Sequence, residues 1–246
     1  MVADQVEVFT HSWEPEAASL RWTSNGREGY SIETLDEPLD RGTRIVIHLK
    51  DEYEEFSQEY RVKELLRRYS NFVGFPINFN GEHINTVQAI WSKSKSDVKP
   101  EEYDEFYQFI SHTDEKPLSY MHFSADAPIM LNALLFIPKR NPEMFGFGRV
   151  DANVSLYCKR VLIDAKPEGL LPEWLRFLNG VVDSEDLPLN ISREMLQDNS
   201  LVRKISDIIT KRFIKHLDKL ARDEKETYKE FYGQFSRYLK EGVVTS

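Results

Sequence analysis

Apolar and polar residues alternate along much of the first fifty residues, a period of two that is typical of half-buried β-strands. Asn25 and Gly26 predict a hairpin-type turn between the second and third of these stretches. In the fourth, Ile45, Ile47 and Leu49 fall on one face. Four such strands alone would expose much of that face, which suggests that they belong to a larger sheet. The predicted strands cover residues 5–10, 20–24, 30–34 and 43–49.

Between residues 54 and 73 the apolar residues recur every three or four positions, which predicts an amphipathic helix with charged residues on its other side. Gly74 and Pro76 end this helix, and Asn80 with Gly81 marks a turn beyond it. We therefore expect the main domain boundary near Gly74. The apolar side of the predicted helix carries Phe56, Tyr60, Leu65, Leu66, Tyr69 and Phe72.

Beyond this boundary helical and strand-like patterns are mixed, which is typical of an α/β protein. A short helix opens at Pro100, strands are expected over residues 130–137 and 154–163, and Val181 with Val182 is strand-like. The chain becomes helical after Pro188, in two helices of which the second is expected to end at Gly242. Their apolar positions are Val202, Ile205, Ile209, Phe213 and Leu217, then Tyr228, Phe231, Phe235 and Leu239.

Composition narrows the class of protein. The chain is 41% hydrophobic and 30% charged with a net charge of -9, which fits a globular protein and opposes binding to a nucleic-acid backbone. No apolar run approaches the length of a membrane span, so we expect no membrane partner. The single cysteine, Cys158, excludes an internal disulfide and is expected to be a buried structural thiol rather than a nucleophile. The first residues carry no secretory signal, so an intracellular location is expected.

The common catalytic motifs of hydrolases, zinc proteases and P-loop proteins are absent from the sequence. Residues 146–149 resemble a phosphate loop only superficially, because a third glycine is missing. Asp183, Glu185 and Asp186 could act as metal ligands or as acid and base, but a solvated turn or a helix cap is the favoured interpretation. The histidines show no metal-ligand spacing and are expected to be surface or hydrogen-bonded residues: His11, His48, His83, His112, His122 and His216.

The segment from Leu187 to Gln197 is more informative. Asn190 or Ser192 can cap a helix N-terminus, where free amide groups favour an anion. A helix beginning there would place Arg193 and Gln197 one turn apart, a reasonable clamp for a phosphate group. On spacing alone, an exposed charged turn is the favoured alternative.

Residues 180–197 closely resemble a signature of the ninety-kilodalton heat-shock chaperone family. The resemblance continues in residues 41–50, 135–138 and 171–177 and spans essentially the whole chain. It implies an α/β (α+β) fold in which residues 1–50 are the last antiparallel strands of an N-terminal ATP-binding domain and residues 51–76 a connecting helix. Residues 77–246 would then be much of a three-layer α-β-α middle domain with its following helices.

The resemblance also implies the site residues. Arg193 matches the family's middle-domain arginine that reaches the γ-phosphate of ATP, and Asn190 and Gln197 match its polar companions. Thr43 matches a threonine near the adenine. The rest of the nucleotide pocket has no counterpart, including the glutamate that acts as base. ATP with Mg²⁺ is therefore expected to bind the full-length protein, an ATPase, and this chain alone is expected to bind nucleotide weakly and to be inactive.

Trp91 and Phe145 match exposed aromatic positions with which the family holds partly folded client proteins, although the sequence alone favours neither the core nor the surface for either ring. Other implied partners are the N-terminal ATPase domain of the same chain and, in the intact protein, a second copy in a parallel homodimer. A long charged linker is missing after Phe72, which favours the bacterial or mitochondrial branch and hence the cytoplasm, with the mitochondrial matrix as alternative. Two other functions stay open: a nucleotide-independent peptide-binding module, and a structural domain without a site.

Overall fold

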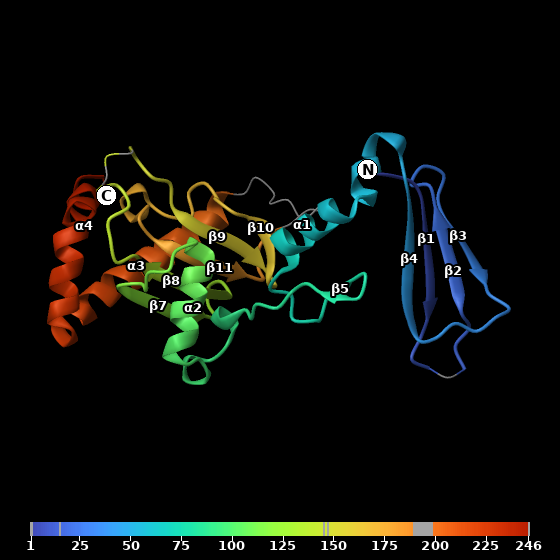
Figure 1. Cartoon of the computed structure of the whole chain (residues 1–246), viewed down its shortest axis with the longest axis horizontal. Helices are drawn as coiled ribbons and strands as arrows, with labels where there is room; N and C mark the ends of the chain where they lie inside the picture. Colours follow the sequence, from blue (N-terminus) through green and yellow to red (C-terminus); the bar gives the residue numbers. More distant parts are fainter. Residues whose placement is uncertain (1, 15, 145, 147, 189–198, 246) are drawn as a thin grey trace. The chain divides into compact units, whose positions relative to one another are not determined.

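The computed structural model describes residues 2–14, 16–144, 146, 148–188 and 199–245. The chain divides into two compact units, residues 1–66 and residues 67–246 (Figure 1). The division falls inside one helix, α1 (Glu59–Ser70).

The first unit contains a four-stranded antiparallel sheet, drawn in blue in Figure 1. Its strands are β1 (Ala3–His11), β2 (Leu20–Ser24), β3 (Ser31–Thr34) and β4 (Gly42–Leu49), in the order β3-β2-β1-β4. All four were predicted from the alternating pattern, and the turn at Asn25 is confirmed because its side chain accepts hydrogen bonds from the amides of Arg27 and Glu28. Ile45 and Ile47 are 59% and 52% exposed, so the predicted open apolar face is also confirmed.

The connecting segment differs from the single helix that was predicted over residues 54–73. Residues Asp51–Ser57 form a 3₁₀ helix, and the α-helix begins only at Glu59 and ends at Ser70. Tyr53, with φ -118° and ψ 20°, interrupts the helical backbone of the first part. The apolar period could not reveal this break, because 3₁₀ and α-helices place side chains on similar faces over one turn.

The second unit contains a five-stranded sheet in the order β10-β9-β11-β8-β7. Its strands are β7 (Ser119–Ala125), β8 (Leu131–Ile137), β9 (Asn153–Cys158), β10 (Val161–Asp164) and β11 (Asn179–Ser184). The central strand β11 runs parallel to β9 and antiparallel to β8. A separate hairpin joins β5 (Asn78–Phe79) to β6 (Glu82–His83) around Asn80 and Gly81, which confirms the predicted turn.

Two features of the larger sheet differ from the prediction. The single strand expected over residues 154–163 is wrong, because Lys159 and Arg160 form a turn that separates β9 from β10, with φ values of 50° and 65°. Strand β7 was not predicted.

Gly180 allows β11 and β8 to pair closely, since a Cβ there would lie 2.2 Å from the carbonyl oxygen of Leu134.

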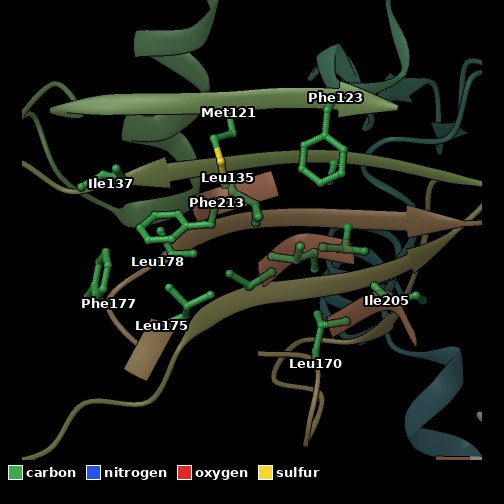
Figure 2. Packing of buried hydrophobic residues seen from close by; sticks show 14 of the residues in the cluster. Met121, Phe123, Leu135, Ile137, Leu170, Leu175, Phe177, Leu178, Ile205 and Phe213 are labelled. Atoms are coloured by element: carbon green, nitrogen blue, oxygen red, sulfur yellow. The ribbon is translucent and has the colours of Figure 1, made fainter. Parts of the chain in front are cut away.

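Helices cover both faces of this sheet, which confirms the three-layer α-β-α fold. Helix α2 (Pro100–Ser111) packs on one face, and α3 (Asn199–Asp223) and α4 (Lys225–Thr245) contribute to the core of the other. Figure 2 shows Met121 and Leu135 of the sheet in the same cluster as Ile205 and Phe213 of α3. The core on the α2 side includes Phe72, Trp91, Tyr103, Phe106, Tyr107, Leu134, Phe136, Tyr157 and Val181.

Helix α4 continues past the end that was predicted for it. Gly242 lies inside the helix, which ends at Thr245. A Cβ on Gly242 would lie 2.7 Å from the Trp174 ring. The glycine is therefore required by close packing rather than by a helix C-cap, and the predicted cap is wrong.

Candidate functional site

The predicted phosphate-contacting residues Asn190, Arg193 and Gln197 lie outside the described residues, as does Phe145. The described chain reaches Pro188 and resumes with α3 at Asn199. The described residues that bear on the prediction are those that lead into this segment and Trp91, all in the second unit, and separately Thr43 in the first unit.

Two side-chain hydrogen bonds fix the chain where β11 ends. Ser184 Oγ donates a hydrogen bond of 2.7 Å to the carbonyl oxygen of Met130. The amide of Met130 donates one of 2.7 Å to Asp186 Oδ2. Leu187, the next residue, is buried. The last residues before the predicted phosphate-contacting segment are thus tied to the start of the neighbouring strand β8.

Asp183 is buried in β11, with 5% of its surface exposed. Its Oδ2 accepts a hydrogen bond of 3.0 Å from Trp91 Nε1 and one of 3.0 Å from the amide of Arg160. Burial raises the pKa of the Asp183 carboxyl, and the hydrogen bond from Trp91 opposes that rise. The solvated turn predicted for Asp183 is therefore wrong, since the residue belongs to the central strand, whereas Glu185 and Asp186 are exposed.

Trp91 has no exposed surface, so the expectation of an exposed ring at this position is wrong. The indole N–H bonds to Asp183, which offsets the usual cost of burying this polar edge. Trp91 is a core residue, and in this arrangement its ring offers no surface to a client. The ring centroid lies 4.7, 5.3 and 5.6 Å from those of Phe72, Tyr157 and Phe106.

Thr43 is exposed near the start of β4. Its Oγ1 lies 2.9 Å from Oγ1 of Thr10, the residue opposite it in β1. Because side chains alternate along a strand, Thr43 shares its face with Ile45 and Ile47. Thr43 therefore lies on the open apolar face of the first sheet.

His122 is a buried histidine with a partner for each ring nitrogen. Nδ1 lies 2.8 Å from the Tyr103 hydroxyl, and Nε2 lies 3.1 Å from the carbonyl oxygen of Trp91. Burial lowers the pKa of His122, so the neutral ring is favoured. The prediction that this histidine is a hydrogen-bonded polar residue is confirmed.

His216 is half-buried at a groove of about 780 Å³ that Lys95 and Lys219 also line. Its Nε2 lies 2.9 Å from Ser119 Oγ. Burial, then the charges of Lys219 and Lys95, lower the pKa of His216 to about 4. Across the described ranges, no three His, Cys, Asp or Glu side chains gather in a way that could hold a metal ion.

Arg176 forms a buried ion network that sequence patterns did not predict. Its Nε donates a hydrogen bond of 2.8 Å to Glu143, and its Nη1 donates one of 2.9 Å to Glu241 of α4. Its guanidinium also lies 4.6 Å from the centroid of the Tyr238 ring. The hydrogen bond from Arg176 lowers the pKa of Glu143. The partners lie 33 and 65 residues from Arg176 along the chain, so no local signal could have shown them.

Comparison with known proteins places these features in a family. A family model described as "Hsp90 protein" matches residues 78–246. The chaperone protein HtpG of Desulfitobacterium hafniense is 54% identical over 245 residues, which are 99% of this chain and 40% of that protein. The mitochondrial TNF receptor-associated protein 1 homolog of Dictyostelium discoideum is 43% identical over 245 residues, 100% of this chain and 34% of that protein. The mitochondrial heat shock protein 75 kDa of Rattus norvegicus is 40% identical over 247 residues, 100% of this chain and 35% of that protein.

The chain thus spans no more than 40% of the length of these relatives. Within the described residues, none of the helices combines the length and apolar character that a membrane crossing requires.

Proposed function

Because the chain belongs to the Hsp90 family, we propose that it is the part of an ATP-driven chaperone that contributes a phosphate-contacting arginine and a surface for client proteins. The observation that carries this proposal is the run of residues 180–197, which resembles the family signature and contains Arg193. The end of β11 supports it, because hydrogen bonds to Met130 hold Ser184 and Asp186, which lie within this run.

Arg193 is the residue proposed to contact the γ-phosphate of ATP held by the N-terminal domain of the same chain. A guanidinium stays charged at all physiological pH values and donates in a fork that matches phosphate oxygens. It can therefore offset the charge that develops on the transferred phosphoryl group. Asn190 and Gln197 would add neutral hydrogen-bonding groups. The base that activates water is proposed to come from the N-terminal domain, so hydrolysis is proposed to require that domain as well.

Thr43 is proposed to lie near the adenine of the same nucleotide. Its position on the open face of the first sheet supports this role, because its hydroxyl is accessible there. Among the described residues, the hydroxyl pairs with that of Thr10. One hydroxyl contributes little affinity by itself. ATP with Mg²⁺ is therefore expected to bind the full-length protein, and this chain alone weakly.

Client contact is proposed for Phe145. Met144, the residue before it, is 58% exposed, and a flexible thioether suits loose apolar recognition. Partly folded proteins are the proposed clients and a homodimer the proposed assembly. The similarity to HtpG supports a bacterial cytoplasmic location, with the mitochondrial matrix as the alternative because mitochondrial relatives also match.

Single-turnover ATP hydrolysis by the full-length protein tests the role of Arg193. Arg193→Ala would be compared with wild type and with Arg203→Ala, which removes an exposed arginine from α3 and serves as a matched control. Nucleotide affinity would be measured in parallel for all three proteins.

A fall of roughly a hundredfold in the hydrolysis rate for Arg193→Ala, at unchanged affinity and with Arg203→Ala at the wild-type rate, supports the proposal. Unchanged hydrolysis in Arg193→Ala refutes it and favours a nucleotide-independent peptide-binding module.

A further inference from the structure

We draw no further inference here: the strongest candidate, the basic groove of about 780 Å³ beside α2, β7 and α3 that Lys95, Arg212 and Lys219 line, restates an established property of the protein.

Discussion

Gly242 and Gly233 form a natural pair for measuring how tightly α4 is packed. An alanine Cβ at position 242 would lie 2.7 Å from Trp174 Cδ2 and 2.8 Å from Cγ. Carbon atoms in contact normally lie about 3.5–4.0 Å apart. At position 233 of the same helix, the new Cβ would have no neighbouring heavy atom within 4 Å. The two substitutions therefore share the change in helix propensity and differ in packing.

The expected magnitudes follow from these contacts. Alanine is favoured over glycine inside a helix by about 0.5–1 kcal/mol. Forcing a methyl group into a packed site costs about 1–3 kcal/mol. The Trp174 ring has little room to move away, because it is 7% exposed and packs on Phe213 at 6.0 Å between centroids. We expect Gly233→Ala to raise the free energy of unfolding by about 0.5–1 kcal/mol and Gly242→Ala to lower it by about 1–2 kcal/mol.

Urea denaturation measures both changes. The helix signal in the far-ultraviolet follows α3 and α4, and an unchanged dependence on urea would show that the same transition is observed in both variants. The reasoning is refuted if Gly242→Ala stabilises the chain as much as Gly233→Ala does, since the Trp174 ring would then not press on this glycine.

Three further predictions concern the side chains of His216, Lys159 and Arg176. His216→Gln should remove a pH dependence of stability, because the unfolded histidine takes up a proton below its ordinary pKa of 6.5 and the folded one only near 4. The free energy of unfolding of the wild type should therefore be complete above pH 6.5 and should fall by about 2 kcal/mol more than that of the variant as the pH drops to 4. Equal losses in urea denaturation of the two proteins over this pH range would contradict the prediction. Lys159→Asn should raise the free energy of unfolding by about 0.5 kcal/mol, because asparagine tolerates the φ of 50° in this turn, and a lower denaturation midpoint would be the opposite result. Arg176→Met should lower the free energy of unfolding by about 3 kcal/mol, because Glu143 and Glu241 lose their buried partner, and a loss below about 1 kcal/mol would show that the network contributes little.

The elements that the sequence predicted well are those with a clear local period. Strands β1, β2 and β4 alternate apolar and polar residues, and α2, α3 and α4 repeat apolar residues at three- and four-residue steps. These patterns report burial of one face, and the structure buries the helical faces in two clusters on either side of the sheet.

Other features were missed or misread because residue type did not indicate the backbone conformation or the packing. The turn between β9 and β10 uses Lys159 and Arg160 at positive φ, where glycine or asparagine is the usual signal. Strand β7 was missed although Met121, Phe123 and Ala125 alternate with His122 and Ser124, a period of two that could have revealed it. Gly242 looked like a helix end because glycine often caps helices, yet here it makes room for a ring from another element.

For the candidate site, too, a local signal supported a prediction and a distant contact gave none. Arg193 was proposed because it lies in a continuous run of residues that resembles a family signature. The contact between Trp91 and Asp183 could not be predicted, since it joins residues 92 positions apart and forms only when the segment that carries Trp91 packs against the sheet.

Affinity for a mimic of the transition state tests the role of Arg193 most directly. The full-length protein and its Arg193→Ala variant would be titrated with ADP alone and with ADP plus aluminium fluoride, which imitates the phosphoryl group in transfer. If Arg193 acts on that group, the variant should bind ADP as wild type does and the mimic about a hundredfold more weakly. Equal affinity of both proteins for the mimic would contradict the assignment.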